Sequence, residues 1–576
     1  MIRDPLQACK EHHNISISTI DIFHQFHFQH TTFAYHSVVM RRRATYITDP
    51  SRAVNPKDIQ VDGNRFLLGA IKAAREERLT LGLNELPKTV AEILQESHEL
   101  HIRWAPEHLF NTVTPFLSRV SPGLHIFYTP LREKQHDRLC GLVHKVFSPS
   151  LRCESVQTSF ISPPLVSERF AQTASRQYYS LLPSIQGLVA YLQRHVCTPS
   201  DLTCLHSASL LNIADSVDLD YDSISHALTL TAFWSKQPEV FYDPIGEFTT
   251  LDAWNIDIQP KRTDKVEVGI LSLDPPQDPS ELTLSGFLTV LGDDVKPKAT
   301  LFSFPSRHHA LAPEQSKQQK YRVSFAEPTG LHPILRISFP SSTALVEPNN
   351  KPPGSTCALQ TYLILPSHIF ADKYAFLSND PLFQKSHHLG QLHTIAGETD
   401  LEAPDYVVEK WGSTLLLGIQ TPDSSSNESQ DPMSWDVTIP LHLRYLVPQA
   451  GGLTRASLPW PVVFWACTAE EGTRFPVNPF DRTHLGFEGL FGPRTMFYHL
   501  DPHPVNSTAN LVEKIQIPVL DTETASSQTV EGVTVFTIVL GFLWVLWKLS
   551  PALLGRVPSN AAGGAGKPVS KAKKKQ

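Results

Sequence analysis

Residues 460–467, WPVVFWAC, decide the fold class of this chain. Five of its eight residues are β-branched or aromatic and none is charged, and the run at 462–467 is typical of a buried β-strand. Similar runs follow one another at 357–365, 414–420 and 435–446, with Pro and Gly between them. Short strands at this density favour an antiparallel sandwich or a barrel-like domain. We therefore predict a mainly β protein.

The upstream sequence adds further strands and a few short helices. Alternating or apolar runs predict strands at 98–104, 124–128, 228–234, 265–273 and 321–325. Three segments have the apolar spacing of short amphipathic helices, namely 66–78 (FLLGAIKAAREER), 87–96 and 183–195.

The motif PLHLRY at 440–445 predicts one more strand with a defined inner face. Successive side chains of a strand point to opposite faces of the sheet. Leu441, Leu443 and Tyr445 are therefore expected to face inward, and His442 and Arg444 to face solvent.

One segment near the C-terminus is long and apolar enough to cross a membrane. Residues 532–549 read GVTVFTIVLGFLWVLWKL, and Lys548 is their only charge. As a helix this segment is about 27 Å long, close to the thickness of the endoplasmic reticulum (ER) bilayer. We predict a single transmembrane helix.

The charges on the two flanks predict its orientation. Basic residues alone follow the segment, whereas Asp521, Glu523 and Glu531 precede it. The positive-inside rule places the basic tail in the cytosol and the large N-terminal part in the lumen. Such a tail also attracts anionic membrane lipid. Lys573 and Lys574 resemble the dilysine signal that retrieves membrane proteins to the ER.

A cytosolic, tail-anchored arrangement is the alternative. The first 39 residues contain no apolar run of the length that a signal peptide requires. In that arrangement the lysine-rich tail would have to cross the membrane, which is unfavourable. The lumenal arrangement is therefore preferred.

Composition shifts and linkers predict seven divisions of the chain. Residues 1–39 are a His-rich extension, and Met40 after it would be a natural alternative start, so the extension is a possible gene-model artefact. Its phenylalanine-histidine stretch is not expected to bind metal, because it lacks carboxylate and cysteine partners. The others are 40–215, a mixed α/β lumenal region; 216–356, a β-rich region with linkers; 357–518, a membrane-proximal β-domain; 519–531, a juxtamembrane linker; 532–549, the span; and 550–576, the cytosolic tail.

The overall charge disfavours nucleic acid as a partner. Lys and Arg number 50 against 57 Asp and Glu, for a net charge of −7. Phosphate binding requires a concentrated basic surface. The 46 prolines also argue against a mostly helical protein, since proline interrupts helices.

The cysteines and sequons suit an oxidising lumen. None of the seven cysteines forms a CxxC pair, which weakens a zinc or redox site. Without Cys9, six remain and fifteen pairings are possible. Sequence order favours Cys140–Cys153, Cys197–Cys204 and Cys357–Cys467, with buried free cysteines as the alternative. Sequons for N-glycosylation occur at Asn14, Asn427 and Asn506.

No motif predicts an active site. Asp218, Asp220 and Asp222 form a DxD pattern like that of metal-dependent glycosyltransferases, but a solvated acidic turn is the preferred interpretation. Nucleophile-elbow, HExxH, phosphate-loop and dinucleotide patterns do not occur in the sequence. We therefore predict no catalytic, cofactor-binding or metal-binding residue. A glycosyltransferase or hydrolase that uses these aspartates is the enzyme alternative.

Several motifs together resemble the PIG-X family, and its fungal PBN branch closely. They are PLHLRY at 440, VVFWAC at 462, NPFD at 478 and the span with its short basic tail, preceded by MRRRATYITDP at 40, AAREERLTLGLNELP at 73 and LHIFYTPL at 124. The resemblance implies a single-pass ER membrane protein with a lumenal domain. It further implies a non-catalytic subunit that stabilises a multi-spanning mannosyltransferase of the PIG-M type.

That enzyme, glycosylphosphatidylinositol (GPI) mannosyltransferase I, adds the first mannose to the GPI-anchor precursor. The family also implies a role in the folding or stability of some ER proteins, and no cofactor. A general lumenal chaperone or a glycan-binding membrane protein is the alternative.

Overall fold

The computed structural model describes residues 41–553 except 133–137, 165–174, 238–240, 243–247, 250–252, 262–263, 276–277, 279, 328, 379, 423–433, 471–479, 481–483, 506–509 and 524–525. All of these residues belong to one unit, residues 39–576. The prediction of a mainly β protein with short helices and one C-terminal apolar helix is confirmed.

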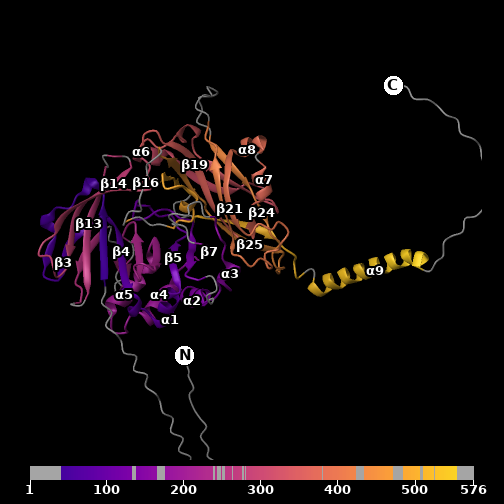
Figure 1. Cartoon of the computed structure of the whole chain (residues 1–576), viewed down its shortest axis with the longest axis horizontal. Helices are drawn as coiled ribbons and strands as arrows, with labels where there is room; N and C mark the ends of the chain where they lie inside the picture. The colour runs from indigo at the N-terminus through magenta and orange to yellow at the C-terminus, as the bar shows by residue number, and fades with distance from the viewer. Residues whose placement is uncertain are drawn as a thin grey trace, which may run out of the picture. The chain divides into compact units, whose positions relative to one another are not determined.

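The N-terminal half is built on a ten-stranded sheet (Figure 1). Its order is β15-β14-β13-β1-β4-β9-β8-β5-β6-β7, and all neighbours are antiparallel except β1 and β13. The bounds are β1 Arg41–Thr48, β4 Ala73–Gly82, β5 Ser97–Ala105, β6 Gly123–Pro130, β7 Arg176–Ser180, β8 Ser216–Asp222, β9 Ala227–Trp234, β13 Lys265–Asp274, β14 Glu281–Val290 and β15 Lys298–Pro305. The sheet thus draws strands from both sides of residue 215.

Short helices and small sheets complete this half. Residues of α1 Lys88–Gln95, α2 Arg138–Val146, α3 Val156–Ser159 and α4 Gln186–His195 share one hydrophobic core with the large sheet, and α5 Leu202–Leu210 follows them. A three-stranded sheet has the order β12-β3-β2, with β12 Trp254–Ile258, β3 Arg65–Ile71 and β2 Gln60–Asp62. A hairpin pairs β10 Phe241–Tyr242 with β11 Phe248–Thr249.

A six-stranded sheet of order β16-β27-β26-β19-β22-β21 organises the C-terminal half. Its strands are β16 His308–Ala310, β27 Thr495–His499, β26 Val462–Thr468, β19 Thr356–Pro366, β22 Gly412–Ile419 and β21 Leu389–Gly397. A four-stranded sheet has the order β23-β18-β17-β28, with β23 Trp435–Pro440, β18 Ile334–Phe339, β17 Lys320–Phe325 and β28 Asp501–Pro502. The predicted strands at 357–365, 414–420 and 462–467 lie in the six-stranded sheet.

Smaller elements surround these sheets. Two strand pairs are β25 Leu453–Pro459 with β29 Val512–Pro518 and β20 Ile369–Phe370 with β24 His442–Leu443, and the helices are α6 Pro313–Gln318, α7 Lys373–Leu377 and α8 Pro381–His387.

The six-stranded sheet contributes to two cores. Tyr362 and Ile364 of β19 belong to the core that includes the N-terminal half. Leu363 and Leu365 of the same strand belong to a second core, which they share with Ile337 of β18. Since side chains alternate along a strand, one buried sheet can serve both cores.

The predicted helix at 66–78 is wrong. The segment forms β3 and the first part of β4. Its Ala, Arg and Glu residues favour a helix, but β4 pairs with β1 on one side and β9 on the other. Cross-strand ion pairs satisfy its charges, as between Arg42 and Glu77. The helices predicted at 87–96 and 183–195 are confirmed as α1 and α4.

The predicted side-chain orientations of the motif PLHLRY, inward or toward solvent, are wrong at two of five positions. Leu441 and Leu443 are buried and His442 is partly exposed, as expected. Tyr445 is exposed, whereas Arg444 is buried. The strand pairing stops at Leu443, and the Arg444 guanidinium then donates to the carbonyl oxygens of Asp400 and Ala403. A strand that ends early loses the alternation on which the prediction relied.

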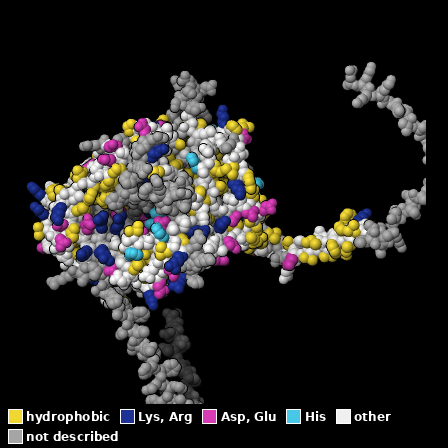
Figure 2. Space-filling view, viewed as in Figure 1, with side chains coloured by type: hydrophobic (Ala, Val, Ile, Leu, Met, Phe, Trp, Pro, Cys, Tyr) yellow, Lys and Arg dark blue, Asp and Glu magenta, His cyan; other side chains and the backbone are white. Residues whose placement is uncertain are grey.

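The apolar C-terminal segment forms α9, Ser527–Leu553. Its span of 23 residues, Gln528–Ser550, has a mean hydropathy of 2.0 and packs against none of the described body. Hydrophobic side chains cover this helix in Figure 2. By length and composition it can cross a membrane.

Candidate functional site

One face of the ten-stranded sheet carries a row of charged side chains where β5 and β8 pair. The register sets Glu99 opposite Asp222, His101 opposite Asp220, and Arg103 opposite Asp218. Residues two apart on a strand share a face, so all six side chains lie on the same side of the sheet. The three aspartates therefore lie on a strand, and the expectation of a solvated acidic turn is wrong.

The outer two aspartates have structural partners. Asp218 is 1% exposed and accepts a 2.7 Å hydrogen bond from Nε of Arg103. Asp222 accepts 2.8 Å bonds from the backbone N–H groups of Ile224 and Ser225 and so holds the β8–β9 turn. These contacts suit a packed strand rather than a DxD site that binds a metal-nucleotide.

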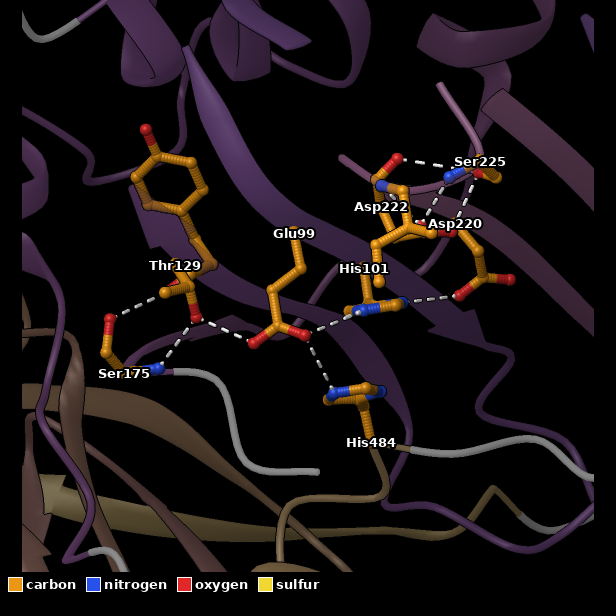
Figure 3. A network of polar contacts seen from close by, with 10 residues as sticks. Glu99, His101, Thr129, Ser175, Asp220, Asp222, Ser225 and His484 are labelled. Atoms are coloured by element: carbon orange, nitrogen blue, oxygen red, sulfur yellow. Dashed lines mark hydrogen bonds and ion pairs between the residues drawn. The ribbon is translucent and has the colours of Figure 1, made fainter. Parts of the chain in front are cut away.

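The middle of the row forms a compact cluster with His484 (Figure 3). Nε2 of His101 and Nε2 of His484 each lie 3.5 Å from Oε2 of Glu99. The other imidazole nitrogen of His101, Nδ1, lies 2.9 Å from Oδ1 of Asp220. The Thr129 hydroxyl donates to Oε1 of Glu99 over 2.7 Å. The cluster joins β5, β6 and β8 to the segment after β26.

The cluster concentrates opposite charges away from water. Burial alone would raise the pKa of Glu99, but the nearby imidazoles of His101 and His484 outweigh burial and lower that pKa well below its usual range. Burial alone would lower the pKa of His101, but Asp220 and Glu99 together raise it to about 9. Burial and the neighbouring His101 lower the pKa of His484.

The backbone at His484 is unusual. Its φ is +66°, in the left-handed region that residues with a Cβ seldom adopt. Its ring stacks on the His101 ring, with centroids 3.8 Å apart and planes inclined by 14°. Strain of this kind persists only where surrounding contacts hold it in place.

Sequence reasoning missed this cluster, and no local signal could have found it. Glu99 and His101 look like ordinary outward residues of an alternating strand. His484 is far away in the chain and lies in no metal-binding spacing. These three residues could hold a metal ion, although the sequence predicted none.

A cavity of about 620 Å³ lies on the other face of the same sheet. Its lining combines aromatic rings of Tyr46, Trp234 and Trp254 with the charged groups of Arg75 and Glu77. Arg75 lies over all three rings, with its guanidinium carbon 4.7 Å from the Trp254 ring centroid. Glu77 pairs with both Arg42 and Arg75.

The structure joins six cysteines as Cys140–Cys153, Cys197–Cys204 and Cys357–Cys467. Cys357 and Cys467 are directly opposite each other on β19 and β26. The sequons at Asn14, Asn427 and Asn506 and the tail residues Lys573 and Lys574 lie outside the described residues.

These features define a class of protein: a β-rich body with a buried polar cluster, followed by one helix able to span a membrane. The family model described as PIG-X / PBN1 matches residues 328–550. "Protein pbn1" of Emericella nidulans is 48% identical over 523 residues, which cover 88% of this chain and 95% of the relative. "Protein pbn1" of Neurospora crassa is 39% identical, and the match covers 93% of this chain and all of the relative.

The chain therefore belongs to the PIG-X / PBN1 family. Among solved structures, the Fcho1 Mu homology domain of Danio rerio matches with 8% identity and a TM-score of 0.12, over 84% of this chain and 97% of that one. A likeness this low carries no argument about fold or function.

Proposed function

We propose that this protein is a non-catalytic subunit that stabilises GPI mannosyltransferase I, the enzyme that adds the first mannose to the GPI-anchor precursor. The observation that carries the proposal is the near full-length match to the PIG-X / PBN1 family, which includes both the β-rich body and the apolar helix. The partner is a multi-spanning catalytic subunit of the PIG-M type, and membrane lipid surrounds the helix.

The proposed location is the ER membrane, with the body in the lumen and the basic tail in the cytosol. Three cysteine pairs within bonding distance support an oxidising compartment. In this topology Asn427 and Asn506 become glycan acceptors, Asn14 is a third candidate, and Lys573 and Lys574 become accessible to the cytosolic retrieval machinery.

A stabilising role has a simple physical basis. A partner that binds only the folded form of an enzyme raises the stability of that form by mass action. α9 exposes apolar side chains at successive positions and therefore around its circumference, so it can pack against other membrane helices as well as lipid. The acidic residues on β8 have structural partners, which supports a protein without a DxD active site. The same body also supports the folding of some ER proteins.

Depletion of the protein in its host tests the proposal. We expect the catalytic mannosyltransferase subunit to decline first and GPI-anchored proteins to follow, because the enzyme loses its partner. Unchanged abundance of the catalytic subunit would contradict the stabilising role. Co-purification with many nascent secretory proteins, rather than with one multi-spanning enzyme, would instead support the chaperone or glycan-binding alternative.

A further inference from the structure

The cluster of Glu99, His101 and His484 has features that ion pairing alone does not explain. The three residues bring one carboxylate oxygen and two imidazole nitrogens within 4.8 Å of one another. We propose that they bind one divalent transition-metal ion of the Zn²⁺ class, which fastens the ten-stranded sheet to the segment after β26. Imidazole and carboxylate ligands together suit Zn²⁺.

The distances support an ion at the centre of the cluster. A charge-assisted N–H···O bond has a length of about 2.7–2.9 Å. Both contacts from imidazole Nε2 to Oε2 of Glu99 are 3.5 Å, which is too long for such a bond. Ligand atoms around a tetrahedral Zn²⁺ with bonds of about 2.0–2.1 Å lie roughly 3.3–3.4 Å apart. The spacing of 3.5 Å is therefore close to that of two ligands on one ion.

The surroundings of the cluster support the same conclusion. A zinc-bound histidine usually donates its other ring N–H to a carboxylate, and ligating carboxylates are themselves hydrogen-bonded. Asp220 lies 2.9 Å from Nδ1 of His101, and Thr129 donates to Oε1 of Glu99 over 2.7 Å. Nε2 of His101 and Nε2 of His484 both face Oε2 of Glu99 (Figure 3).

The site lies away from the large cavity and joins distant parts of the chain. His484 is 8% exposed, and none of the three ligands lines the 620 Å³ cavity. β5 and His484 are far apart in the sequence, so an ion between them closes a long loop of chain. The two rings are stacked, so binding of the ion requires them to turn until both Nε2 lone pairs point at it.

Metal binding to the full chain tests the proposal. The purified protein in detergent is stripped with a chelator and titrated with Co²⁺, whose visible absorption reports coordination, and Zn²⁺ is then added as competitor. We expect about one Co²⁺ per chain, displaced by Zn²⁺, and a Tm that rises when Zn²⁺ is added. Asp220→Asn is expected to weaken binding about 10–100-fold, because it removes the group that orients His101.

Matched variants separate this site from other histidines. His484→Ala removes a ligand but keeps His24, His27 and His30, so the difference in bound metal measures the cluster alone. His388→Ala is the control: His388 also has a positive φ, +53°, and its ring stacks on Trp435 with centroids 3.9 Å apart. We expect binding to be lost in the first variant and kept in the second.

Two further variants keep the test decisive. Glu99→Gln replaces His484→Ala if the latter does not fold. The triple change of His24, His27 and His30 to Ala is expected to leave binding intact. A wild-type protein that binds no Co²⁺, binding unchanged in both ligand variants, or binding abolished by the triple change would overturn the proposal.

Discussion

Tyr362 and Leu363 are neighbours on β19, yet their side chains belong to different hydrophobic cores. The Tyr362 hydroxyl lies 3.3 Å from Nε2 of Gln177 on β7, in the N-terminal half. Leu363 packs in the core between the six-stranded sheet and the four-stranded sheet. One strand therefore couples the two halves of the body.

This coupling predicts that the body unfolds as one cooperative unit. Leu363→Ala removes a side chain that is 1% exposed and is expected to cost about 2–5 kcal/mol. We expect near-UV circular dichroism and tryptophan fluorescence to show one shared transition at a lower denaturant concentration. Two separate transitions in the variant would contradict the coupling.

The ion pair of Arg103 and Asp218 is predicted to be essential for stability. Asp218→Ala leaves the Arg103 charge buried without this carboxylate, at a cost of about 3–5 kcal/mol. Asp222→Ala is the matched control on the same strand, and it loses turn bonds worth about 1 kcal/mol. Chemical unfolding of the two variants gives the comparison. Equal stabilities would refute the buried-pair interpretation.

The three disulfides are predicted to differ in their contribution to stability. Cys357–Cys467 closes a loop with a sequence separation of 110, against 7 for Cys197–Cys204. Loop-closure entropy then gives about 5 kcal/mol for the first and about 2 kcal/mol for the second. Unfolding of the paired Cys→Ser variants measures this order. Full alkylation of all cysteines in the unreduced, denatured protein would show that the bonds do not form.

Acid stability is predicted to depend on Glu77. Burial alone would raise its pKa, but the charges of Arg75 and Arg42 outweigh burial and lower it from 4.5 to about 2. A lowered folded-state pKa adds stability above pH 4.5, and this stability is lost as the pH falls toward 2. The loss amounts to about 3 kcal/mol. In a plot of the free energy of unfolding against pH, Glu77→Gln should reduce the slope between pH 4.5 and 2 relative to wild type. Identical slopes for the two proteins would contradict the role of Glu77.

The β-rich body is predicted to lie in the ER lumen. Endoglycosidase treatment of the native protein should increase its gel mobility, and replacing Asn427 and Asn506 with Gln should remove most of that shift. Asn14→Gln separately tests the third sequon. Degradation of the body by protease added to sealed microsomes would place it in the cytosol and exclude the proposed function.

Local sequence patterns predicted an element correctly where its neighbours in the tertiary structure favour the same secondary structure as its own residues. The run at 462–467 forms β26 because β-branched and aromatic residues suit a strand buried on both faces. α9 follows from apolar length alone. Residues 66–78 show the opposite case, because pairing with β1 and β9 overrides their helical composition.

The sequence by itself determined the mainly β class, the apolar helix and the family resemblance, since each depends on residues close together in the chain. Only the tertiary structure decided that Arg444 turns inward, that Asp218 pairs with Arg103, and that His484 meets Glu99 and His101. These contacts join segments far apart in the sequence, and a charged side chain becomes buried only where another segment supplies its partner.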